Sequence, residues 1–92
     1  MSRDILYSFV RCPFAIRARW ALINCNIIVE IREIKISNKP NSLLEISPKG
    51  TVPVLLTKEG EIIEESIDII YWAVKKTGFN NFLSQSLNKK KL

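Results

Sequence analysis

Two cysteines are the side chains of this 92-residue chain best suited to covalent chemistry, because the chain contains no histidine. Without histidine, neither a Ser-His-Asp nor a Cys-His arrangement exists within the chain, and no imidazole can bind a metal. If a helix joins Cys12 to Cys25, a rise of ~1.5 Å per residue places them roughly 20 Å apart. A disulfide needs Cα atoms within about 7 Å. The sequence therefore predicts two free thiols, which a reducing compartment preserves.

Cys12 occupies the position with the greater chemical promise. It follows an apolar segment, residues 5–10, and precedes Pro13, which favours the first turn of a helix. Unpaired N–H groups and the positive dipole end of a helix favour a thiolate there, and Arg11 adds a neighbouring cation. Ala15 stands where a second redox cysteine would be, so a redox cycle at Cys12 needs an external thiol. Position alone leaves a reactive thiol and a packing thiol equally open.

The elements that would position this thiol follow from hydrophobic periodicity and from turn residues. The first helix carries Cys25 on its apolar face, as a buried small hydrophobe, and Asn26 is a left-handed stop after it. Ser42 is expected to cap a short helix, and Ser66 to cap a last helix that Gly78 ends. The pattern predicts strands at 5–10, 27–33, 52–56 and 61–64, helices at 14–25 and 43–47, and a last helix between the Ser66 cap and Gly78.

The order β-α-β, short helix, β-β-α predicts an α/β fold in which a four-stranded mixed sheet has helices on both faces. Pro53 lies among apolar β residues, where it cannot donate to a central ladder. Either its strand is an edge, or the proline marks the start of the strand in a special bond geometry. In the last helix, the buried stripe is expected to be Ile67, Ile70, Tyr71 and Val74.

The charge and hydropathy of the chain argue against nucleic acid and membrane as partners. Three of the 14 basic residues are Lys89, Lys90 and Lys91, so the formal net charge of +5 falls to 11 basic against 9 acidic, or +2, over residues 1–88. A lysine tip of this kind is typical of a solvated tail. The apolar segment 5–10 is too short for a signal peptide, and nothing approaches the ~20 apolar residues of a membrane span. A cytoplasmic location is the expectation.

Three motifs together resemble the N-terminal thioredoxin-fold domain of glutathione S-transferases. They are C-P-F-A at residues 12–15, G-T-V-P-V-L at 50–55 and E-S-I-D-I-I at 65–70. The sequence is most similar to the cysteine-type, omega-like class and its bacterial relatives, and two-domain glutaredoxins share much of the pattern. The resemblance covers about residues 5–76. It implies a thioredoxin-like (glutaredoxin-like) fold, with glutathione as co-substrate and no metal.

The resemblance also implies roles for individual residues. Val52, before a cis Pro53, would pair its backbone with the cysteinyl unit of glutathione, like an added strand. Glu65 would accept from the γ-glutamyl ammonium, while Ser66 and the helix N-terminus would take the carboxylate. Taken alone, Glu65 reads as a solvated charge, as do its neighbours Glu59, Glu61 and Glu64, and Ser66 as a helix cap.

Three further residues complete the implied glutathione site. Phe14 would form a wall near the sulfur, Lys39 would lie near the glycyl carboxylate, and Cys12 would face the glutathione thiol. Taken alone, Lys39 reads as an exposed loop lysine. Trp20, Trp72 and Tyr7 are interpreted as packing residues.

The function implied is a monothiol glutathione-dependent thiol transferase or reductase, acting on a thiol, disulfide or electrophilic substrate. The family continues into a helical second domain, so residues 1–78 are expected to form the glutathione-binding domain and residues 79–92 a tail or linker at the start of an absent helical domain. A non-catalytic thioredoxin-fold interaction module, working as a homodimer or with a helical partner, is the alternative.

Overall fold

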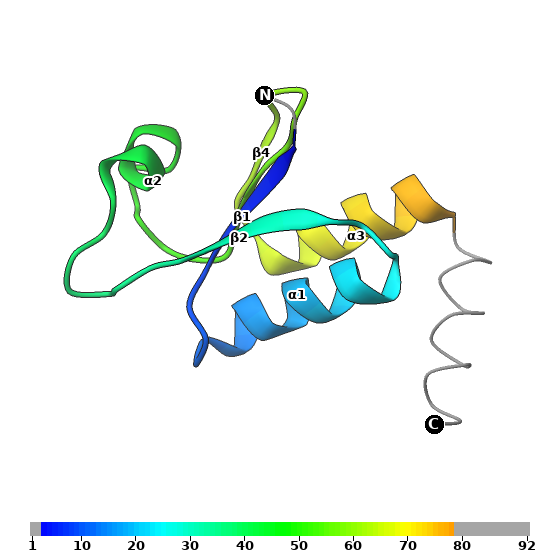
Figure 1. The fold of residues 1–92 in the computed structure, drawn as a ribbon, viewed down its shortest axis with the longest axis horizontal. Coiled ribbons are helices and arrows are strands. Elements are labelled where there is room, and N and C mark those ends of the chain that lie inside the picture. Colours follow the sequence, from blue (N-terminus) through cyan, green and yellow to red (C-terminus); the bar gives the residue numbers. More distant parts are fainter. Residues whose placement is uncertain (1–2, 79–92) are drawn as a thin grey trace.

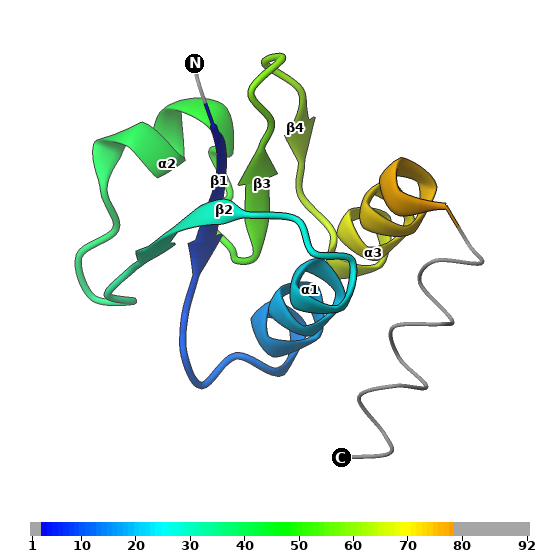
Figure 2. The ribbon, with the colours of Figure 1, turned by 45° about the vertical axis from the view of Figure 1, so that its right-hand side comes forward.

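The computed structural model describes residues 3–78 as a four-stranded mixed sheet with helices on both faces (Figure 1). This is the architecture that the sequence predicts. Two helices lie side by side on one face, and the short helix lies on the other (Figure 2). The strands are β1 (Asp4–Ser8), β2 (Val29–Glu33), β3 (Val54–Leu56) and β4 (Ile62–Ile63), and the helices are α1 (Pro13–Asn24), α2 (Asn41–Ile46) and α3 (Ser66–Thr77).

β1 lies inside the sheet, whose strand order is β2-β1-β3-β4. It pairs in parallel with β2 and antiparallel with β3, and β3 pairs antiparallel with β4. All five residues of β1 are buried, because its alternating side chains face helices on both sides. Leu6 belongs to the core beneath α1 and α3, whereas Ile5 and Tyr7 belong to the core beneath α2. The interior position of β1 expected from its apolar sequence is confirmed.

α1 begins and ends within one residue of the predicted range 14–25. Pro13 is its first residue, and Asn26 has a φ of 56° just beyond its last turn. The Asn26 N–H donates to the Ile23 carbonyl, and the Ile27 N–H donates to the Leu22 carbonyl. This pair of hydrogen bonds is the Schellman arrangement, which satisfies carbonyls that the helix end leaves unpaired.

Pro53 stands at the start of β3, not within an edge strand. The bond between Val52 and Pro53 is cis, and β3 begins at Val54. β3 lies between β1 and β4, so the edge alternative is wrong. The missing N–H of Pro53 therefore removes no hydrogen bond from the ladder.

Neither serine that was expected to cap a helix does so. Pro40 precedes α2, so Ser42 lies inside this helix, and its Oγ accepts a hydrogen bond of 2.9 Å from the Tyr7 hydroxyl. Glu65 is the N-cap residue of α3, and Ser66 is the first residue of that helix. Both hydroxyls bond to residues of other elements, because tertiary partners outcompete the local backbone donors.

The buried stripe expected on α3 is wrong by about one residue. Ile69 and Ala73 are fully buried, whereas Ile67 is 49% exposed and Tyr71 66% exposed. The helix is apolar on several sides, so periodicity alone does not choose the face that packs. Packing against α1 determines which face of α3 is buried. Together with Ala73 of α3, the small side chain of Ala18 on α1 lets the two helices approach closely.

No helix among the described residues is long and apolar enough to cross a membrane. The tail or linker predicted for residues 79–92 lies outside the described residues, so it stays a prediction.

We expect Ile69→Ala to lower the free energy of unfolding by about 2–5 kcal/mol, because it opens a cavity in the core. The matched variant Ile67→Ala should cost less than about 1 kcal/mol, because Ile67 is half exposed. Urea denaturation followed by circular dichroism measures both values. Equal losses in the two variants would contradict the observed packing of α3.

Candidate functional site

Cys12 lies where β1 gives way to α1, directly before Pro13, the first residue of the helix. Its side chain is half-buried, and its thiol makes a long hydrogen bond of 3.8 Å to the Val52 carbonyl. Its backbone N–H donates to the Phe9 carbonyl, and its own carbonyl accepts from the Ile16 N–H. This contact brings the C-P-F-A motif and the G-T-V-P-V-L motif together. Cys12 and Val52 are 40 residues apart in the sequence.

A cavity of about 360 Å³ opens beside this thiol. Five of the seven predicted site residues line it: Phe14, Val52, Pro53, Glu65 and Ser66. Cys12 reaches the cavity through its contact with Val52 and is not itself a lining residue. Sequence reasoning missed three residues that also line the cavity, namely Lys49, Thr51 and Glu64.

Lys39 stands apart from the other predicted residues. It does not line the cavity, and its side chain instead passes over Gly50, where its Nζ would lie 3.3 Å from an added Cβ. Gly50 has a φ of 65°, and its missing side chain leaves room for the Lys39 stem. Gly50 directly precedes Thr51, which does line the cavity.

Arg17 connects α1 to α3 at the edge of the cavity. Its guanidinium Nη2 donates a 2.8 Å hydrogen bond to the Ser66 Oγ, and it lies 5.1 Å from the centroid of the Phe14 ring. Ser66 is buried and accepts from Arg17, so its hydroxyl proton is left to donate to another acceptor. Sequence reasoning missed Arg17. The only signal for it is its position one helical turn after Phe14.

Two glutamates bring negative charge to the same cavity. Glu65 lies 3.8 Å from the Lys49 Nζ, but both side chains are mostly exposed, so this ion pair contributes little. Glu64 is half-buried, and its carboxylate accepts a 2.5 Å hydrogen bond from the buried Ser47 hydroxyl. The expectation that Glu64 is a solvated charge is therefore wrong.

The charges around the cavity suit a ligand that carries both signs. The Arg17 and Lys49 cations and the N-terminus of α3 favour carboxylates. The Glu64 and Glu65 carboxylates favour an ammonium group. The arrangement can therefore hold a short zwitterionic peptide next to a thiol.

A larger cavity of about 540 Å³ adjoins the first over β4 and α3. The two cavities share Lys49, Glu64 and Glu65, but the larger one contains neither Phe14 nor Pro53. We place the candidate site in the smaller cavity, because of the two only that one is lined by Val52, whose carbonyl contacts the Cys12 thiol. Among residues 3–78, no group of three or more acidic or cysteine side chains is arranged to hold a metal ion.

Cys25 differs from Cys12 in its burial. Both are free thiols, at opposite ends of α1, as predicted. Cys25 is 4% exposed in the core beneath α1 and α3. Burial raises the pKa of the Cys25 thiol, and the hydrogen bond with Thr77 offsets only part of that rise. Cys25 is therefore a packing residue, and Cys12 is the accessible thiol.

Comparison with known proteins gives a consistent result. The family model described as "Glutathione S-transferase, N-terminal domain" matches residues 6–80. The mouse protein named glutathione S-transferase omega-1 is 39% identical over 62 residues, which cover 67% of this chain and 26% of the mouse protein. The chain thus spans about a quarter of the length of this curated relative.

Solved structures agree in fold. The trimeric glutathione transferase TDR1 of Leishmania is 33% identical with a TM-score of 0.75, over 83% of this chain and 17% of that chain. Rice GST1, solved in complex with glutathione, is 30% identical with a TM-score of 0.74, over 82% of this chain and 34% of that chain. The thioredoxin-like fold predicted from the sequence is confirmed.

At pH 7.5, we expect iodoacetamide to modify Cys12 of the folded protein and to modify Cys25 more than about tenfold more slowly. Cys12 is half-buried at a cavity, whereas Cys25 is buried with a raised pKa. Peptide mass mapping gives the two rates. The Cys12→Ser variant should take up label only after unfolding in urea, and equal labelling of both thiols would contradict this assignment.

Proposed function

The chain belongs to the glutathione S-transferase family, as the N-terminal domain of that family, and we propose that it binds glutathione beside Cys12 and transfers thiol groups through that sulfur. The main support for the proposal is the contact of the Cys12 thiol with the carbonyl of Val52, which lines the same cavity as Glu65 and Ser66. A single peptide ligand could therefore contact both the Cys12 sulfur and the polar side chains of the cavity. In this proposal, residues 1–78 form the glutathione-binding domain.

Backbone pairing would orient the ligand. Val52 and Pro53 directly precede β3, so an extended tripeptide could add to the Val52 backbone as a short strand. Main-chain pairing of this kind fixes the direction of the ligand whatever its side chains are. It would direct the cysteinyl sulfur of glutathione toward Cys12, with Phe14 as a wall of the cavity.

Charged groups would hold the two ends of glutathione. At the γ-glutamyl end, Glu65 would accept from the ammonium, while Ser66 and the first N–H groups of α3 would donate to the carboxylate. Arg17 holds the Ser66 hydroxyl in place. At the glycyl end, Lys39 is the proposed partner of the carboxylate.

The proposed reaction is exchange between thiols and disulfides. The Cys12 thiolate attacks the glutathione sulfur of a mixed disulfide, which forms a Cys12–glutathione disulfide and releases the substrate thiolate to take up a proton. A second glutathione, as thiolate, attacks the same glutathione sulfur, which frees Cys12 and forms oxidised glutathione. The substrate disulfide is reduced, and two glutathione units leave as the oxidised dimer. The exchange uses no histidine base, because the attacking group is the thiolate form of Cys12.

The position of Cys12 favours this route over conjugation to an electrophile. A thiolate next to a disulfide that carries glutathione exchanges with it directly, and no further oxidant or reductant is consumed in that step. Which second substrate is used depends on the whole protein and not on this chain alone. The chain spans about a quarter of its omega-1 relatives, so the proposal extends only to disulfides that carry glutathione.

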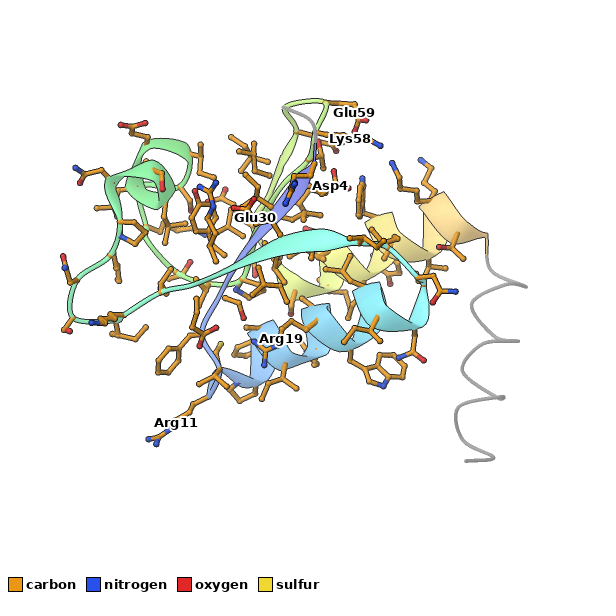
Figure 3. The ribbon with its side chains drawn as sticks, viewed as in Figure 1. Asp4, Arg11, Arg19, Glu30, Lys58 and Glu59 are labelled. Carbon is orange, nitrogen blue, oxygen red and sulfur yellow. The ribbon has the colours of Figure 1, made fainter. Side chains whose placement is uncertain are left out.

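Glutathione binding tests the first half of the proposal. We expect isothermal titration calorimetry to show binding that Glu65→Gln weakens about 10- to 100-fold, because the carboxylate charge that faces the ligand ammonium is lost. The matched control Glu59→Gln makes the same change at the turn between β3 and β4, and it should leave the affinity within about twofold (Figure 3). Equal effects of the two variants would contradict the assigned site.

Turnover tests the second half. With a glutathionylated peptide and glutathione, Cys12→Ser should reduce the rate by about 100-fold or more, because the nucleophile is lost. Cys25→Ser is the control, and it should keep most of the activity. Mass spectrometry of the Cys25→Ser protein under turnover should detect glutathione on Cys12. Glutathione binding without turnover in the unmodified chain would favour the non-catalytic binding module.

A further inference from the structure

Glu64 is the half-buried member of the two adjacent glutamates that line the cavity beside Cys12. It directly follows β4, which leads into α3 (Figure 2). Ile63, the residue before it, packs into the core beneath α1 and α3. Neighbouring side chains at a strand point to opposite faces of the sheet. The Glu64 side chain is therefore directed toward the face that carries α2.

A fixed partner on that face holds the Glu64 carboxylate. Ser47, which follows α2, donates its hydroxyl to Glu64 Oε2 at 2.5 Å. Ser47 is fully buried, and its backbone is held on both sides. Its N–H donates to the Leu43 carbonyl at 2.8 Å, and its carbonyl accepts from the Gly50 N–H at 2.9 Å. A hydrogen bond from this donor orients the carboxylate and leaves Glu64 Oε1 to accept from a ligand.

Glu65 differs from Glu64 in exposure and in pairing. The Glu65 side chain is 66% exposed, and its carboxylate lies 3.8 Å from the Lys49 ammonium. Among residues 3–78, no lysine or arginine nitrogen lies within 4 Å of the Glu64 carboxylate. A carboxylate that is partly removed from water without a cation beside it is unfavourable. The charge of Glu64 therefore favours a cationic group that enters the cavity.

The γ-glutamyl end of glutathione carries such a group. Its ammonium and its carboxylate are bonded to one carbon atom, so the two groups must bind close together. Glu64, Glu65 and Ser66 are consecutive in the sequence, and all three line the cavity. With the carboxylate on Ser66, the ammonium lies on the side of the two glutamates.

Given the proposed binding of glutathione, we propose that Glu64, held by Ser47, is a second partner of the γ-glutamyl ammonium and makes the site selective for thiols whose γ-glutamyl amino group is free. An ammonium group has three N–H donors, so Glu64 and Glu65 can accept from it at the same time. Glu64 is oriented before the ligand arrives, and this reduces the conformational freedom that is lost on binding.

The selectivity follows from the sign of the charge. A ligand that lacks the ammonium group offers no cation to the two glutamates, and it still removes water from the half-buried Glu64. A ligand with an acylated nitrogen keeps the atom but loses its positive charge. The substrates that fit are therefore glutathione and mixed disulfides of glutathione, and not their N-acylated forms.

The hydrogen bond between Ser47 and Glu64 also joins α2 to the end of β4. If it served only the fold, its loss would change the shape of the cavity and weaken every ligand alike. If it positions the Glu64 carboxylate, its loss weakens only ligands that carry the ammonium group. A change in the ligand therefore separates the two roles.

Isothermal titration calorimetry of the full chain with two ligands tests the proposal. One is glutathione, and the other is glutaryl-cysteinyl-glycine, which lacks only the ammonium group. The unmodified chain should bind glutathione about 30-fold more tightly or better, because the second ligand forms no charge-assisted hydrogen bond with the glutamates. Glu64→Gln should weaken glutathione about tenfold, and Ser47→Ala about three- to tenfold. Neither variant should weaken the glutaryl peptide, so that its affinity also reports an intact cavity.

Two matched variants control for the loss of a charge and of a hydroxyl. Glu59→Gln at the turn between β3 and β4, and Ser42→Ala inside α2, should each leave both affinities within about twofold. Equal affinities of the unmodified chain for the two ligands, equal weakening of both by Glu64→Gln, or no effect of that variant on glutathione would each overturn this proposal, while glutathione binding itself stands. A chain that binds neither ligand would overturn the proposal together with the proposed function.

Discussion

The pairing of β1 on both of its sides is the constraint on which the rest of the structure depends. β1 leads toward Cys12, whereas β3 runs in the opposite direction and begins just after Val52. β4 is antiparallel to β3, so it runs parallel to β1 and ends before Glu65. The end of β1, the start of β3 and the end of β4 therefore meet at one edge of the sheet. Because β1 is buried on both faces, a shift of register would carry apolar side chains out of both cores.

This edge gains its chemical character from the helices that start there. The N-terminus of α1 lies beside the thiol, and the N-terminus of α3 lies beside Ser66. Arg17 binds the two helices together through the Ser66 hydroxyl. Glu65 and Lys49 then place both signs of charge around a single cavity. A peptide with an ammonium group, carboxylates and a thiol matches this set of groups, and a purely anionic or purely apolar ligand does not.

Much of the fold was predictable because its signals are local. Pro13 and Asn26 mark the two ends of α1, and the apolar residues of β1 indicate an interior strand. The face of α3 was not predictable, because its apolar residues surround much of the helix. Ile69 is buried and Ile67 is not, and the difference lies in how closely α1 approaches. The roles of Ser42 and Ser66 were not predictable either, because their hydrogen-bond partners lie in other elements.

The sequence by itself determined the order of the elements, the two unpaired thiols and the motifs that identify the family. These features depend on residues within a few positions of one another, so they can be read along the chain. Only the tertiary structure decided that Lys49, Thr51 and Glu64 line the cavity, and that Lys39 does not line it but passes over Gly50. These residues come from a loop and from the end of β4, and the sheet brings them together. No local pattern encodes such contacts, because they depend on where distant segments meet.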